Sequence, residues 1–158
     1  LILFNNCNLK RKINFNLSKD SNLLLCENII FGRTSMKEEF EKGYFSDFWN
    51  INIDKKLIHT EAINTGLFEK KYLNSFSTLN KNSAVATIII VGNKFLNNVN
   101  NLSETLTNNE NTTSNYSQWD NKLILRLLSK DSYNLKFAID KILSYFFEGS
   151  KIPKVWNI

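Results

Sequence analysis

The stretch FWNINIDKKLIHTEAI, residues 48–63, decides the fold class of this chain. Trp49, Ile51 and Ile53 alternate with polar residues, which places them on one face of an extended strand. The triplet DKK at residues 54–56 interrupts this pattern, and apolar residues return after it. The stretch therefore predicts a β-hairpin whose turn type stays open, because the turn contains no glycine.

Alternating and apolar segments extend the β pattern on both sides of this hairpin. In KINFNLS, the apolar residues Ile13, Phe15 and Leu17 alternate with asparagines and are expected on a buried face. AVATIIIVG is short, β-branched and almost wholly apolar, which is typical of a strand buried on both faces. The predicted strands outside the hairpin are residues 12–18, 22–32, 84–92 and 121–129.

Two segments have the periodicity of helices. Apolar residues recur every three or four positions across residues 95–106, at Phe95, Val99, Leu102 and Leu106. The second helix is predicted from Asp131 or Ser132 as its cap to Gly149 after its end. Its apolar side is lined by Leu135, Ile139, Ile142 and Phe146. Residues 107–118 are polar and lack periodicity, which predicts a loop.

The order of these elements is strands first, followed by helix, strand and helix. Because regular βαβ alternation is missing, a doubly wound fold is disfavoured. The length of 158 residues suits a single hydrophobic core. We therefore expect a mainly β protein with two helices, of the α+β class, forming a single domain over residues 1–158.

Composition narrows the classes of function. The net charge of +5 permits nucleic-acid partners, but the densest basic run is only KRK at residues 10–12. The segments KRKINF and FEKKYLNSF combine basic and aromatic residues weakly. The two cysteines, Cys7 and Cys26, form no CxxC pair, which favours a reducing, cytoplasmic location. A basic β-rich domain that binds nucleic acid is thus the alternative function.

Tests for catalytic chemistry find little support. His59 is the only histidine, so a resident zinc or nickel site would need more nitrogen or sulfur ligands than the chain offers. Glu38, Glu39 and Glu41 crowd together, and a hydrolase using them is a third hypothesis. No glycine-rich phosphate loop occurs. We predict no catalytic residues and a non-enzymatic binding or scaffolding role.

A series of motifs in fixed order carries a family resemblance. Glu27 precedes Gly32 and Arg33, and Met36 and Glu38 follow in the place of a Met-Gly-Glu step. The segments AVATIIIV, WDNKLILRLL and IPKVW then occur at residues 84–91, 119–128 and 152–156. In this order the chain resembles the C-terminal portion of the urease accessory protein UreD family, called UreH in some organisms. The missing initiator Met agrees with a fragment of a longer protein.

The resemblance implies a fold, a role and partners. Members of the family are similar to an elongated, β-helix-like stack of strands and are not enzymes. They bind UreF, which recruits the GTPase UreG, and the complex docks on the urease apoprotein to deliver nickel. By this resemblance no cofactor is bound permanently, and nickel passes through the protein in transit.

The resemblance also suggests roles for particular residues, with alternatives left open. Gly32, Arg33 and Met36 form the structural motif, in which Arg33 pairs with Glu27 or Glu38 to fix a turn. Alternatively, Glu27 or Glu38 lines the nickel passage as an oxygen ligand. Phe146, Phe147 and Trp156 either contact UreF or lie in the core of the chain itself. Lys37 stands where the family has glycine, which would carry a steric cost if the backbone there has a positive φ.

Overall fold

The structure, a computed structural model, describes residues 1–33, 36–97, 99–148 and 151–156. These residues form two compact units. Unit 1 contains residues 1–21 and 30–81, and unit 2 contains residues 22–29 and 82–158. Both units are built mainly of strands, with helices added, so the α+β class is confirmed. The expectation of a single domain stays a prediction.

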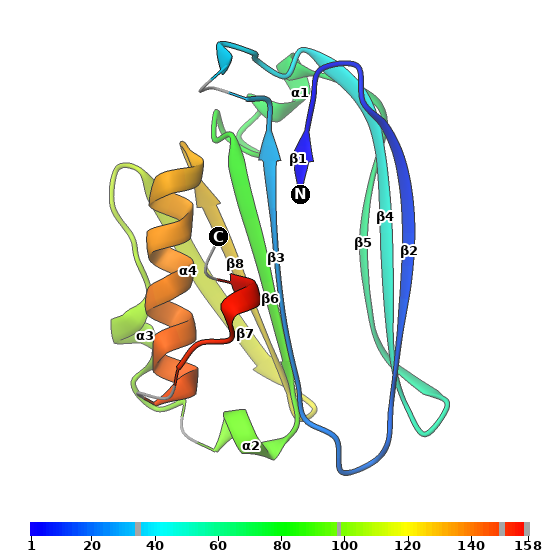
Figure 1. The fold of residues 1–158 in the computed structure, drawn as a ribbon, viewed down its shortest axis with the longest axis vertical. Coiled ribbons are helices and arrows are strands. Elements are labelled where there is room, and N and C mark those ends of the chain that lie inside the picture. Colours follow the sequence, from blue (N-terminus) through cyan, green and yellow to red (C-terminus); the bar gives the residue numbers. More distant parts are fainter. Residues whose placement is uncertain (34–35, 98, 149–150, 157–158) are drawn as a thin grey trace. The chain divides into compact units, whose positions relative to one another are not determined.

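Unit 1 is built on a three-stranded sheet in the order β2-β4-β5. Strand β2 (Asn8–Leu17) is parallel to β4 (Lys42–Ile53), which is antiparallel to β5 (Lys56–Glu69) (Figure 1). The short helix α1 (Lys70–Leu73) follows β5. The two-residue strand β1 (Ile2–Leu3) pairs with the last two residues of β3 (Leu23–Phe31). The parallel pairing of β2 with β4 was not predicted.

The hairpin predicted from residues 48–63 is confirmed as β4 and β5. Asp54 and Lys55 have φ angles of 46° and 67°, which identifies a two-residue turn of type I′. Trp49 and Ile51 are buried, with exposed fractions of 5% and 0%. The alternation along the stretch therefore selected the correct face.

Unit 2 contains a sheet in which β3 is followed by β6 (Ala84–Val91), β8 (Lys122–Ser129) and β7 (Thr112–Trp119). Helix α4 (Ser132–Phe147) packs on one face of this sheet (Figure 1). Every residue of β6 except Val85 is buried, as predicted for a strand covered on both faces. Among the described residues, no helix is long and apolar enough to cross a membrane.

Helix α4 agrees with its prediction and identifies its cap. The Asp131 side chain accepts a hydrogen bond from the Asn134 backbone N–H at 2.8 Å, so Asp131 and not Ser132 is the N-cap. The predicted apolar side is buried, at Leu135, Ile139, Ile142 and Phe146. The C-cap Glu148 is left-handed. Gly149, expected after the helix, lies outside the described residues.

Two predictions in unit 2 were wrong. The single helix expected over residues 95–106 is replaced by the short helices α2 (Asn93–Leu96) and α3 (Leu102–Thr105). Asparagine has a low helix propensity, and the intervening segment is rich in it. The loop expected at residues 107–118 is largely strand β7, which pairs with β8 at the edge of the sheet. A 3-10 helix (Lys154–Trp156) lies near the C-terminus.

Candidate functional site

The Gly-Arg motif of unit 1 forms a closed turn. Arg33 and Glu38 form an isolated antiparallel bridge. The Arg33 backbone N–H donates to the Glu38 carbonyl at 2.8 Å, and the Glu38 backbone N–H donates to the Arg33 carbonyl at 3.1 Å. Met36 N–H also donates to the Arg33 carbonyl at 2.8 Å. The backbone alone therefore fixes both ends of the turn.

A side-chain ion pair reinforces this bridge. Arg33 Nε donates to Glu38 Oε2 at 2.6 Å, and Arg33 Nη2 contacts the same oxygen. Glu38 Oε1 accepts a hydrogen bond from the Asn5 backbone N–H at 2.8 Å. The Asn5 N–H and then Arg33 lower the pKa of Glu38 from its usual value. Of the two partners that the sequence left open for Arg33, the structure pairs it with Glu38.

Gly32 is placed where only glycine fits. Its φ is +84°, and its N–H donates to the Leu3 carbonyl at 2.8 Å. A Cβ atom at this position would lie 2.8 Å from the Glu38 carbonyl oxygen and 2.9 Å from the Phe40 nitrogen. The positive φ and the close approach of the backbone both require a residue without a side chain.

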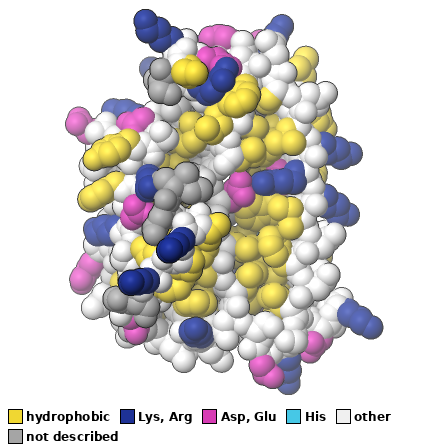
Figure 2. Space-filling view, in the orientation of Figure 1, with side chains coloured by type: hydrophobic (Ala, Val, Ile, Leu, Met, Phe, Trp, Pro, Cys, Tyr) yellow, Lys and Arg dark blue, Asp and Glu magenta, His cyan; other side chains and the backbone are white. Residues whose placement is uncertain are grey.

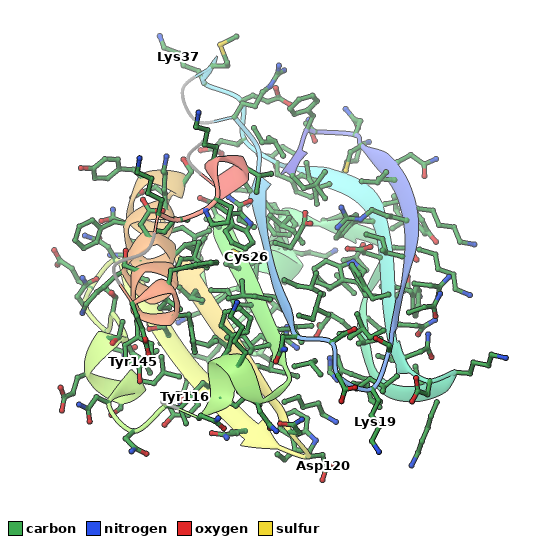
Figure 3. The ribbon with its side chains drawn as sticks, turned by 60° about the horizontal axis from the view of Figure 1, so that its bottom comes forward. Lys19, Cys26, Lys37, Tyr116, Asp120 and Tyr145 are labelled. Carbon is green, nitrogen blue, oxygen red and sulfur yellow. The ribbon has the colours of Figure 1, made fainter. Side chains whose placement is uncertain are left out.

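Met36 and Lys37 occupy the end of this turn. Met36 is 69% exposed. Lys37 has a φ of +56°, so this position does require the left-handed backbone that glycine adopts without cost. Figure 3 shows the Lys37 side chain pointing away from the ribbon at the end of the turn. Because the backbone here has a positive φ, Lys37 carries the steric cost expected for a residue other than glycine at this position.

Asn5, near the start of the chain, holds the turn in place, and sequence reasoning missed it. Besides its N–H bond to Glu38, its side-chain Oδ1 accepts hydrogen bonds from the backbone N–H groups of Glu41 and Lys42, both at 3.1 Å. These contacts attach the segment after the turn to the start of the chain. The partners are 36 and 37 residues away in sequence, so no local pattern could have indicated them.

The acidic residues after the turn are used in ion pairs. The Lys70 ammonium contacts both Glu39 and Glu41, and Lys71 Nζ lies 2.7 Å from Glu69 Oε2. The hydrogen bond from Lys70 lowers the pKa of Glu39, and that from Lys71 lowers the pKa of Glu69. A general acid needs a pKa raised toward neutrality, so this arrangement does not favour the hydrolase hypothesis.

Glu27 lies on β3 in unit 2 and is half-buried. Glu38 belongs to unit 1, so the two acids proposed for the nickel passage are in different units. Burial, followed by the charges of Glu27 and Asp140, raises the pKa of the neighbouring Cys26 thiol to about 12. Within the described residues, no group of three or more His, Cys, Asp or Glu side chains could hold a metal ion.

The aromatic residues predicted at a partner surface contact one another and the chain. Phe146 is buried, with 8% exposed, whereas Phe147 and Trp156 are half-buried. The Phe147 ring centroid lies 6.2 Å from that of Phe95 and 5.9 Å from that of Trp156. The rings therefore join α2, the end of α4 and the C-terminal 3-10 helix.

Sequence reasoning also missed the charged residues that lie on the buried face of the unit 1 sheet. Asp47 is 2% exposed and accepts hydrogen bonds from Arg11 Nε at 2.9 Å, Arg11 Nη2 at 2.6 Å and Trp49 Nε1 at 2.9 Å. On β5, His59 Nε2 lies 3.5 Å from Glu61 Oε2. The signal for Asp47 was available, because it alternates in phase with Trp49 and Ile51.

Basic side chains form no single patch on the face seen in Figure 2. Lys and Arg are spread over several places there, between polar and apolar side chains. Counterion release from a nucleic acid requires several cations aligned on the phosphate backbone. This face offers no specific support for the nucleic-acid alternative.

Comparison with known proteins identifies the class. The family model of the UreD urease accessory protein matches residues 1–157. A UreD urease accessory protein of Rhizobium leguminosarum bv. viciae is 31% identical over 160 residues, covering 99% of this chain and 56% of that protein. The chain therefore belongs to the UreD urease accessory protein family.

Two further relatives show how far the match extends. The UreD protein of Agrobacterium fabrum is 27% identical over 161 residues, covering 99% of this chain and 54% of the relative. That of Granulibacter bethesdensis is 39% identical over 89 residues, covering 56% of this chain and 37% of the relative. The chain spans about half the length of the relatives that match it throughout, 56% for the Rhizobium protein.

Proposed function

We propose that this chain is part of a non-enzymatic urease maturation factor. In this role it forms a scaffold that binds UreF and UreG and helps to deliver nickel to the urease apoprotein. The observation that carries the proposal is the family match over residues 1–157. Membership of an accessory protein family supports a role in urease maturation, and the partners and the cargo are the proposed extension of that role.

The contacts of the motif residues support a scaffold. Arg33, Glu38 and Asn5 use their polar groups to hold the backbone of the turn, and Gly32 permits its close approach. Ion pairs with Lys70 occupy the neighbouring acids. These side chains stabilise a surface of defined shape, which is what a protein that assembles other proteins requires.

Nickel is the proposed cargo, and Glu27 and Glu38 are the two proposed passage residues. The Glu38 carboxylate is already bonded by Arg33 and by the Asn5 N–H, and a metal ion would have to displace these donors. Glu27 is half-buried on β3, where a carboxylate oxygen suits weak, exchangeable binding of a divalent ion. Nickel transfer that is normal in a folded Glu27→Ala variant would exclude this role.

The UreF contact is proposed at the C-terminal aromatic cluster, formed by Phe95, Phe147 and Trp156. The half-buried Phe147 and Trp156 offer part of their rings to a partner, whereas the buried Phe146 belongs to the core. We further propose the β-helix-like stack expected of the family. We place its action in the cytoplasm, where both cysteines stay reduced.

The test is co-purification of the full-length protein with the UreF and UreG of the same organism, followed by urease activation in the presence of Ni²⁺. Trp156→Ala is expected to weaken co-elution with UreF. Phe137→Ala is the matched control, because Phe137 is a 64% exposed aromatic residue of α4 outside the cluster. A monodisperse full-length protein that ignores UreF would contradict the proposal. Salt-sensitive binding to random RNA or DNA would then favour the nucleic-acid alternative.

A further inference from the structure

Strand β2 has an open edge along its whole length. It is the outermost strand of the unit 1 sheet, and all ten of its residues pair with β4 on the other side. The Asp54 N–H donates to the Leu17 carbonyl at 3.0 Å, so the odd-numbered residues of β2 turn their backbone groups toward β4. The even-numbered residues therefore turn theirs outward. In the described part of the chain, no strand pairs with this outer edge.

The exposed face of β2 carries two cations without a carboxylate opposite them. Lys10 and Lys12 are exposed, and their neighbours in β4 are Ser46 and Phe48. Neither lysine forms an ion pair with a residue that the structure describes. Residues two apart on a strand lie on the same face, roughly 6.6 Å apart, so the edge presents two ammonium groups on one side. Figure 2 shows dark blue side chains along the right-hand margin, where Figure 1 places β2.

The opposite face of β2 is mainly apolar and incompletely covered. Ile13 and Phe15 are half-buried, whereas their neighbours in β4, Trp49 and Ile51, are 5% and 0% exposed. The charge of Arg11, on this same face, is held in an ion pair within the sheet. A strand added at the outer edge would cover the apolar side chains with alternate residues and would face the two lysines with the others.

We propose that the outer edge of β2 binds an extended, acidic segment of a partner protein as an added strand. In that segment acidic residues alternate with apolar ones, so that the acidic residues lie opposite Lys10 and Lys12 and the apolar residues lie beside Ile13 and Phe15. A second copy of this chain fits poorly, because its own lysines would face Lys10 and Lys12. The inference rests on β2 and does not depend on the proposed function.

The test titrates the full-length protein into a fluorescent peptide of the length of β2, in which glutamate and valine alternate, and follows the anisotropy of the label. Amide hydrogen exchange, read by NMR, locates the peptide and shows that each variant is folded. We expect saturable binding and slower exchange of the outward-facing amides of Lys10 and Lys12. The double variant Lys10→Glu with Lys12→Glu should weaken this binding by about tenfold and should instead bind a peptide of alternating lysine and valine.

The control is the double variant Lys141→Glu with Lys151→Glu, which makes the same change of charge at two exposed residues of unit 2 and should bind the glutamate–valine peptide as the wild type does. Absence of binding, or equal binding by the two double variants, would overturn the proposal. Slow exchange of the Lys10 and Lys12 amides before the peptide is added would also overturn it, because the edge would then already be occupied. Equally tight binding of a single-stranded RNA of the same charge would assign the lysines to a general anion surface and overturn it too.

Discussion

Replacing Gly32 by alanine tests the account of the turn. The new Cβ atom would lie 2.8 Å from the Glu38 carbonyl oxygen and 2.9 Å from the Phe40 nitrogen, both of which are backbone atoms. The φ of +84° adds a conformational penalty of roughly 1–2 kcal/mol for a residue with a side chain. Relief of the close contacts by backbone shifts costs roughly a further 1–3 kcal/mol. We expect Gly32→Ala to reduce the free energy of unfolding by about 2–5 kcal/mol.

The assay is equilibrium unfolding in urea, where this loss lowers the midpoint by about 1–2.5 M if the slope stays at about 2 kcal/mol per M. Gly66→Ala is the matched control. Gly66 also has a positive φ, of +58°, but a Cβ atom there meets nothing within 4 Å. This control should cost only the conformational penalty, about 1–2 kcal/mol. Equal losses for the two variants would refute the close-contact argument.

Three further predictions concern separate features. Lys37→Gly should raise the free energy of unfolding by about 1 kcal/mol in the same urea assay, because the left-handed backbone then carries no side chain. Asp131→Ala should cost about 1 kcal/mol through loss of the N-cap. Because its hydrogen bonds, above all that from the Asn134 N–H, lower the pKa of Asp131, this difference is present at neutral pH and is lost as pH falls through the folded pKa. Iodoacetamide at pH 8 should alkylate Cys26 much more slowly than Cys7, read by peptide mass spectrometry, because burial raises the pKa of Cys26 to about 12.

Local periodicity was sufficient for the elements whose partners lie nearby in sequence. The β4–β5 hairpin and helix α4 follow from alternation and from three- and four-residue spacing within single segments. Strand β7 was missed because hydroxyl groups line its buried side. Thr112 and Ser114 are buried, and Thr112 Oγ1 lies 3.0 Å from Ser129 Oγ on β8. A strand that buries small hydroxyl side chains looks polar throughout and resembles a loop.

Non-local contacts account for the rest. The parallel register of β2 with β4 pairs Arg11 with Asp47, and no local pattern specifies such a partner. In the turn, the pairing of Arg33 with Glu38 was one of two stated alternatives, since both residues lie within the motif. The contribution of Asn5 depends on a backbone bond across 33 residues. Fixed turns of this kind can be anticipated from sequence, but the segment that anchors them cannot.

The interleaving of the two units along the chain has a consequence for how the protein can be divided. Residues 22–29 belong to unit 2, although residues on both sides of them belong to unit 1. A truncation after residue 81 would keep β3 but remove β6, its neighbour in the sheet. A truncation before residue 30 would remove β2, the parallel partner of β4. No single break in the polypeptide frees either unit intact. A gene fusion or fission must therefore keep both units on one polypeptide.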